Sequence, residues 1–510
     1  MNKQLKLLNL FLIILLLVFQ YFVVLSEHTA LPSQEWSRSF PTNTNSGTYA
    51  KIHSVPTDDG YAISLLDFKK MDILDCSTDM DCTLKSTNLE LNPYKNTWSD
   101  GDVSYFIHED SLIRSSSSEN TTIASNVENF TKSNHSLVYW LKNNEVVIQH
   151  DEDQPISYTP EFPVHTSMIV NEQVFVITNN MQENLYIVLD GANEFVELFQ
   201  FYLNPSENLT SMQIAGELDS KKYSLLLDTE ILSAGKRTKV IRHASFDLSQ
   251  NQEPSLTKLK FVDQESGSEL TDIRFPLLLG GENGPHITFS AYTYDKTGEK
   301  TNNVFSGKYD SSLIEASAVT KKNDTYVQPI FLNDQTIAYF KLNGKEKTLM
   351  YSSSTEEQRL LSEQVQEGDY KEALFSLIGL LFNGFALVLL SFVWIIPALG
   401  IAYGILAILQ KTHKAFAHAK AFYLNIFLLL FSQLVSFSTL IHPERMISKA
   451  PYLSEVWHVY LVIFIASIAC VLPVFLSRTK VTEDNFNSLI LYTTAMNLII
   501  ILFILGPYFL

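Results

Sequence analysis

The chain has 510 residues, which is too long for one ordinary domain, and it carries a formal net charge of −18 at pH 7. Residues 27–370 hold 50 Asp and Glu against 27 Lys and Arg, whereas the rest of the chain holds 5 against 10. Nucleic-acid binding requires clustered Lys and Arg, so the acidic segment argues against a nucleic-acid partner and is typical of a solvated surface.

The N-terminal segment predicts export. Lys3 and Lys6 precede an apolar run from Leu7 to Leu25, whose 19 residues are long for the apolar part of a signal peptide and sufficient for a membrane span. We expect residues 1–26 to be a transmembrane anchor, with a signal peptide cleaved after Ser26 as the alternative. In both cases the positive end stays in the cytoplasm and the chain is exported from residue 27.

Residues 27–355 alternate apolar and polar positions in short runs, a pattern that predicts a β-rich extracytoplasmic domain. Turn sequences such as Asn143-Asn144, Asp190-Gly191 and Asn343-Gly344 separate these runs. Antiparallel hairpins are therefore expected throughout this segment.

Cys76 and Cys82 lie in this domain in the sequence "DCSTDMDC", and their spacing allows a disulfide in an oxidising compartment. A calcium site using Asp75, Asp79 and Asp81 is the alternative, but the run lacks the glycine and the distal glutamate of a calcium loop. We therefore expect no metal site here.

The hairpin units recur at loose intervals of roughly 30 to 45 residues. The units begin near Val103, His135, Thr166, Ser211, His286 and Val327, and the widest gap, before His286, is long enough for one more unit.

Residues 328–355 contain Pro329, the turn Asn333-Asp334, the strand "TIAYF", the turn Asn343-Gly344 and the closing strand "TLMYSSS". This order resembles one repeat of the WD40-like, TolB-type β-propellers. The resemblance implies a β-propeller, a rigid platform whose loops and central channel contact other molecules. A β-sandwich is the structural alternative.

A helical stalk is expected over residues 356–372, followed by a four-span membrane domain over 373–510. The apolar run Ala373–Leu409 would be about 56 Å long as one helix, against about 30 Å for a bilayer core. A single crossing places the following basic residues, Lys411, Lys414 and Lys420, at the cytoplasmic lipid surface, as the positive-inside rule favours. Pro397 is expected to kink or end the helix near Ile396, so that 398–409 is tilted, re-entrant or interfacial.

Three further spans are expected at Ala421–Ile441, Val456–Leu476 and about Phe486–Phe509. Alternation then predicts a cytoplasmic N-terminus, extracytoplasmic residues 27–372 and an extracytoplasmic C-terminus.

The four C-terminal spans contain no Asp, Glu, Lys or Arg, although ion-coupled transporters usually carry such residues at membrane depth. Their neutral or weakly basic polar residues are Asn383, Asn425, Gln433, His458 and Asn497. Hydrogen bonds between helices, about 0.6 kcal/mol each, are the preferred interpretation, and a polar substrate path is the alternative.

The sequence contains no HExxH, no phosphate-binding GxxxxGK, no GxSxG and no dinucleotide fingerprint, so we expect no cofactor and no catalytic residues. The leading hypothesis is an integral membrane protein whose exported domain binds a protein partner or a cell-envelope ligand, with lipid around its spans. A transporter or lipid-handling protein regulated by that domain is the alternative, and a hydrolase whose Asp or His residues converge only in the fold is the third.

Overall fold

The chain folds into two compact units, a propeller unit of Leu31–Glu363 and a helical unit of Met1–Ala30 with Gln364–Leu510. The structure is a computed structural model. It describes residues 3–42, 44, 47–67, 70–87, 94–116, 119–151, 153–179, 184–191, 194–204, 207–217, 221–233, 235–249, 254–281, 284–294, 300–309, 312–322, 324–412, 417–441, 443–447, 449–450, 452–476 and 480–509.

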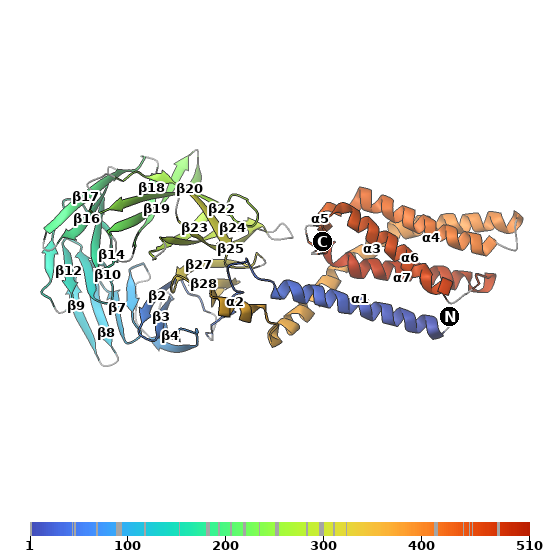
Figure 1. Cartoon of the computed structure of the whole chain (residues 1–510), viewed down its shortest axis with the longest axis horizontal. Coiled ribbons are helices and arrows are strands. Elements are labelled where there is room, and N and C mark those ends of the chain that lie inside the picture. Colours follow the sequence, from blue (N-terminus) through green and yellow to red (C-terminus); the bar gives the residue numbers. More distant parts are fainter. Residues whose placement is uncertain are drawn as a thin grey trace. The chain divides into compact units, whose positions relative to one another are not determined.

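The described residues of the propeller unit form seven sheets of four or five strands, and each sheet is one blade of a β-propeller (Figure 1). The first three sheets are β2 (Lys51–Thr57), β3 (Gly60–Leu66), β4 (Met71–Ser77) and β5 (Cys82–Thr87); β6 (Thr97–Ser99), β7 (Val103–His108), β8 (Ser111–Ser116) and β9 (Asn120–Ser125); and β10 (Val127–Lys132), β11 (Ser136–Leu141), β12 (Val146–His150) and β13 (Ile156–Tyr158).

The next two sheets are β14 (Val164–Val170), β15 (Gln173–Asn179), β16 (Asn184–Gly191) and β17 (Glu194–Tyr202); and β18 (Glu207–Gly216), β19 (Lys222–Ser233), β20 (Lys236–Asp247) and β21 (Thr257–Lys258). The sixth is β23 (Thr271–Leu279), β24 (His286–Tyr294), β25 (Lys300–Lys308) and β26 (Leu313–Ala318), to which β22 (Lys260–Asp263) adds a parallel strand. The seventh is β27 (Tyr326–Phe331), β28 (Thr336–Asn343), β29 (Glu346–Ser353) and β1 (Phe40–Pro41).

The seventh sheet combines both ends of the propeller unit, because β1 pairs antiparallel with β29 in the order β1-β29-β28-β27. The first strands of most consecutive sheets lie next to one another, and β2 of the first sheet lies next to β27 of the seventh. The second and third sheets share a buried cluster that includes Trp98 and Phe130. A buried cluster that includes Ile63 and Phe340 joins these two sheets. The ring is therefore closed, which confirms the expected propeller and overturns the β-sandwich alternative.

The repeat pattern expected from the sequence missed the first blade, which begins at Lys51, and placed the second, third and sixth blades one strand late, at Val103, His135 and His286. The wide gap before His286 holds no further sheet among the described residues. It is filled by β19 and β20, which have 12 residues each, and by β21 to β23.

The last element of the propeller unit is the short helix α2 (Glu356–Glu363). Arg38 Nε donates a hydrogen bond of 2.5 Å to the Ser362 carbonyl at its end. The helical unit resumes at α3, which begins at Glu367.

The described residues of the helical unit include five helices that are long and apolar enough to cross a membrane. Its elements are α1 (Lys3–Thr29), α3 (Glu367–Thr412), α4 (Ala417–Ser436), the π-helix η2 (Phe437–Ile441), α5 (Pro443–Ile447), α6 (Val456–Leu476), α7 (Glu483–Ile504) and the 3₁₀-helix η3 (Gly506–Tyr508). Helix α3 is continuous through Pro397, so the expected helix end near Ile396 was wrong and residues 398–409 extend the same helix.

Helix α1 packs against the other helices along one side. Val24 and Leu25 are buried against Ala373 and Leu377 at the start of α3. Farther along α1, the fully buried Gln20 donates a 3.0 Å hydrogen bond from Nε2 to the Tyr452 hydroxyl. A buried polar group needs such a partner, so α1 belongs to the bundle by both apolar and polar contacts.

Candidate functional site: a basic pocket in the propeller

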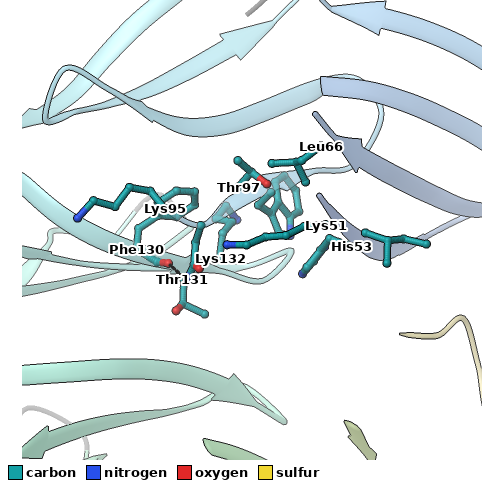
Figure 2. A pocket seen from close by; sticks show the side chains of 11 residues that line it. Lys51, His53, Leu66, Lys95, Thr97, Phe130, Thr131 and Lys132 are labelled. Atoms are coloured by element: carbon teal, nitrogen blue, oxygen red, sulfur yellow. Dashed lines mark hydrogen bonds between the residues drawn. The ribbon is translucent and has the colours of Figure 1, made fainter. Parts of the chain in front are cut away.

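A pocket of about 190 Å³ lies where the first three blades meet. Its cationic lining consists of Lys51 and His53 on β2, Lys95 just before β6, and Lys132 at the end of β10 (Figure 2). None of the lining residues that the structure describes is acidic. A cationic pocket is therefore set into a segment in which acidic residues outnumber basic ones by almost two to one.

Hydrogen bonds between neighbouring blades hold the walls of the pocket in place. The Asn96 side chain donates from Nδ2 to the Phe130 carbonyl at 2.8 Å, and the Asn96 backbone N–H donates to Asn129 Oδ1 at 2.9 Å. Thr131 Oγ1 donates to the Ser167 carbonyl on β14 at 2.9 Å. Because these bonds cross between separate sheets, the closed ring sets the geometry of the pocket.

Two of the four basic side chains, Lys95 and Lys132, are already partnered. Lys95 Nζ lies 2.6 Å from Glu128 Oε1. Lys132 Nζ donates to the carbonyls of Ser133 and Asn134 and lies 5.0 Å from the centre of the Trp98 ring. In Figure 2 the Lys51 side chain extends toward Lys132, whereas Lys95 points away from the other labelled residues.

The side chains of Lys51 and His53 make no hydrogen bond or ion pair with any residue that the structure describes. Both are reached by solvent, yet the surrounding protein atoms lower the pKa of each group by partial loss of hydration. Burial also lowers the pKa of Lys132, against the opposing influence of Asp151, Asp100 and Glu172. No carboxylate offsets this loss for Lys51, so its positive charge is available to a bound anion.

The pocket has an apolar and hydroxylic wall as well as its cations. Trp98 and Phe130 are buried beneath it, and Ile52 and Leu66 complete the apolar part. Three polar side chains, Asn96, Thr97 and Thr131, complete the lining. Among the described residues of the whole chain, no group of three His, Cys, Asp or Glu is placed to hold a metal ion. The arrangement is suited to binding an anion.

Cys76 and Cys82 form a disulfide between neighbouring strands, with Cys76 on β4 directly opposite Cys82 on β5. The bond closes the hairpin at the edge of the first blade. Its six-residue separation matches a tight hairpin turn.

The structure brings together two of the polar residues expected within the spans. Gln433 on α4 donates from Nε2 to Asn497 Oδ1 on α7, and Asn497 Nδ2 lies 3.4 Å from Ser467 Oγ on α6. Asn425 is buried, and its side-chain amide has no partner among the described residues. His458 accepts from the Ser454 and Glu455 backbone N–H groups at the start of α6.

The remaining expected residues do not form a site. Lys411 and Lys420 are exposed at the end of α3 and in the first turn of α4. The Asn383 side chain and Lys414 lie outside the described residues.

Sequence reasoning missed Lys51, His53, Lys95 and Lys132. Lys51 and His53 alternate in the run "KIHSV", which marks one face of a strand. Nothing in the sequence relates that face to Lys132, 79 positions after His53, because only ring closure makes these strands neighbours.

No protein-family model matches this sequence, and neither does the sequence of any curated protein. Solved structures similar to the chain include the N-terminal domain of Nup159, with 11% identity over 64% of this chain and 97% of that chain and a TM-score of 0.37. The WD40 domain of SCAP from fission yeast has 9% identity over 64% and 100%, with a TM-score of 0.36. The β-propeller domain of the Trilobed protease from Pyrococcus furiosus has 10% identity over 60% and 96%, with a TM-score of 0.37. These likenesses concern the fold alone.

Proposed function

We propose that this protein is an integral membrane protein whose propeller binds a protein partner or a cell-envelope ligand outside the cytoplasm. The observation that carries the proposal is the basic pocket, since the unpaired Lys51 ammonium group and the His53 imidazole face solvent inside an otherwise acidic propeller. An unpaired charge that is partly removed from water raises the free energy of the free protein. Binding of a ligand with the opposite charge lowers this free energy.

The surface of the helical unit supports insertion into a bilayer. Phe375, Phe382, Phe475 and Leu491 are each more than 70% exposed. Soluble proteins rarely expose so many large apolar side chains on adjoining elements, whereas lipid contact makes such exposure favourable. Membrane lipid is accordingly one partner in the proposal.

The ends of α1 and α3 support one arrangement of the spans. His28, in the last turn of α1, lies 2.9 Å from Ser376 Oγ in the first turns of α3. The two connections to the propeller therefore leave the bundle at the same end, as they must if the propeller lies on one side of the membrane. With the positive N-terminal end in the cytoplasm, the propeller is extracytoplasmic.

The topology is tested by fusing a reporter enzyme that is active only outside the cytoplasm at Lys414 or at Leu510. The proposal expects activity from the fusion at Leu510 and none from the fusion at Lys414. Activity at Lys414 would overturn the single crossing of α3.

The binding function is tested by photo-crosslinking of the full chain in its own membrane. A crosslinking side chain at Tyr94, which is 80% exposed next to Lys95, probes the pocket, and one at Tyr294, which is 69% exposed on the sixth blade, is the matched control. The proposal expects a defined adduct from position 94 and none from position 294. Equal labelling from both positions would remove the pocket from the binding surface.

A further inference from the structure

The chemistry of the basic pocket narrows the class of ligand. Lys51 and Lys132 supply two ammonium groups from different blades, His53 supplies an imidazole, and none of the described lining residues is acidic. We infer that the pocket binds the phosphate group of a small organic phosphate, placed between Lys51 and Lys132. This inference rests on the proposed binding function and specifies its ligand.

The cations of the pocket suit a phosphate group. The planar fork of Arg binds carboxylate and phosphate alike through two parallel N–H donors. The described lining has no Arg and uses Lys instead, a compact point charge that is a common phosphate binder. Two ammonium groups also match the charge of a phosphate monoester, which is about −1.5 to −2 at pH 7.

The ammonium group of Lys132 is held in a fixed position in the free protein. Lys132 is fixed by the carbonyls of Ser133 and Asn134 and lies over the Trp98 and Tyr105 rings at 5.0 and 5.7 Å. Lys51 makes no such contacts within the described chain, so its ammonium group is free to turn toward the ligand. One cation is therefore preorganised, and the other closes on the phosphate.

The size and the apolar wall of the pocket limit the rest of the ligand. A volume of about 190 Å³ corresponds to about six water molecules at roughly 30 Å³ each. This space holds a phosphate with a short organic group, and Ile52 and Leu66 offer apolar contact for that group.

The inference is tested by isothermal titration calorimetry on the full chain in detergent, with glycerol 3-phosphate as the probe and sodium chloride matching the ionic strength. We expect saturable one-site binding, weakened at least five-fold by Lys51→Gln and by Lys132→Met. Lys345→Gln, at an exposed turn of the seventh blade, removes the same charge outside the pocket and should leave the affinity unchanged. Lys51→Arg, which keeps the charge, should retain most of the binding.

A second arm identifies the source of the phosphate. Glycerophosphoglycerol, a lipid headgroup without its acyl chains, is titrated beside glycerol 3-phosphate. Tighter binding of the monoester supports a small soluble ligand, and tighter binding of the diester assigns the same pocket to a headgroup. No binding of either probe, or equal binding by the Lys51→Gln variant, overturns the inference. If position 94 still gives its defined crosslinked adduct in that case, the proposed binding function stands and only the phosphate assignment fails.

Discussion

Phe40 lies opposite Tyr351 across the pairing of β1 with β29, and their ring centres are 5.6 Å apart. The pairing joins the first strand of the propeller unit to its last, so that the N-terminal segment completes the seventh blade. Ser37 N–H donates to the Ser353 carbonyl at 2.9 Å and continues the same connection. The segment before β2 therefore adds backbone and ring contacts to the seventh blade, beside the packing of β2 against β27.

Tyr339 is the polar anchor of this closure. Its hydroxyl donates to Ser39 Oγ at 2.7 Å and shares a hydrogen bond with Ser352, while the ring is fully buried. We expect Tyr339→Phe to lower the free energy of unfolding by about 1 to 3 kcal/mol, because the buried Ser352 hydroxyl and the partly buried Ser39 hydroxyl lose a partner. Denaturant unfolding of the full chain in detergent measures this effect. Tyr294→Phe, at an exposed ring, should change nothing, and equal effects from both variants would contradict the assignment.

The disulfide between Cys76 and Cys82 provides a test of compartment. Disulfides persist in oxidising compartments and are rare in the cytoplasm. Protein isolated without reductant, denatured and alkylated should carry label on Cys470 alone, which is a free buried cysteine. Reduction before alkylation should give three labelled cysteines by mass spectrometry. Three labels without reduction would place this blade in a reducing compartment, against the proposed export.

His243 makes the propeller sensitive to acid. It is buried on β20, it shares a hydrogen bond with the Tyr309 hydroxyl through Nδ1, and burial lowers its pKa to about 3. The unfolded chain takes up this proton near the ordinary pKa of 6.5. The stability contributed by neutral His243 is therefore complete above about pH 6.5 and falls as the pH decreases toward 3, by about 1.4 kcal/mol per pH unit.

The measurement for His243 is the thermal midpoint of unfolding between pH 7.5 and pH 4.5. We expect the midpoint to fall with decreasing pH in the native chain and to fall less steeply in His243→Asn. His135→Asn is the control, since His135 is exposed beside Asp151 at 3.4 Å. Parallel pH profiles for the native chain and His243→Asn would show that other groups cause the acid sensitivity.

The fold was predictable where the sequence is locally consistent. The aliphatic and aromatic strand "TIAYF" is followed closely by the turn Asn343-Gly344, so that neighbouring residues in the sequence already indicate the hairpin of β28 and β29. The two-residue strand β1 could not be predicted, because its pairing with β29 lies about 310 positions away and leaves no period in the sequence. The prediction of a helix end near Pro397 was wrong, because α3 extends for several turns on both sides of this proline.

The basic pocket was not predictable, although each of its residues was visible. Lys51 is only one of 37 basic residues, and its importance comes from the absence of a described partner and from Lys132 on another blade. Both properties are set by the packing between blades rather than by any local pattern. The polar residues of the spans were easier to find, because Gln433 and Asn497 stand out against an apolar background, but their mutual contact was not.

The hydrogen bond between Gln433 and Asn497 decides between a structural and a transport role for the polar span residues. If these residues stabilise the bundle, Gln433→Leu or Asn497→Leu should each lower its stability by about 0.6 kcal/mol or somewhat more, since the remaining partner stays buried. The double variant should recover part of this loss, because it leaves neither partner of the pair unsatisfied. Asn425→Leu should instead maintain or raise stability, since the Asn425 amide is buried without a partner among the described residues.

Thermal unfolding of the four variants in one detergent, followed by the near-ultraviolet circular dichroism signal, tests this pattern. A polar substrate path gives a different result, in which all three single variants keep native stability while uptake of the substrate is lost. A non-additive loss confined to Gln433 and Asn497 would therefore favour the structural role, because direct contact is what couples two substitutions. Equal stability of all variants would contradict it and would direct attention to Asn425 as part of a path.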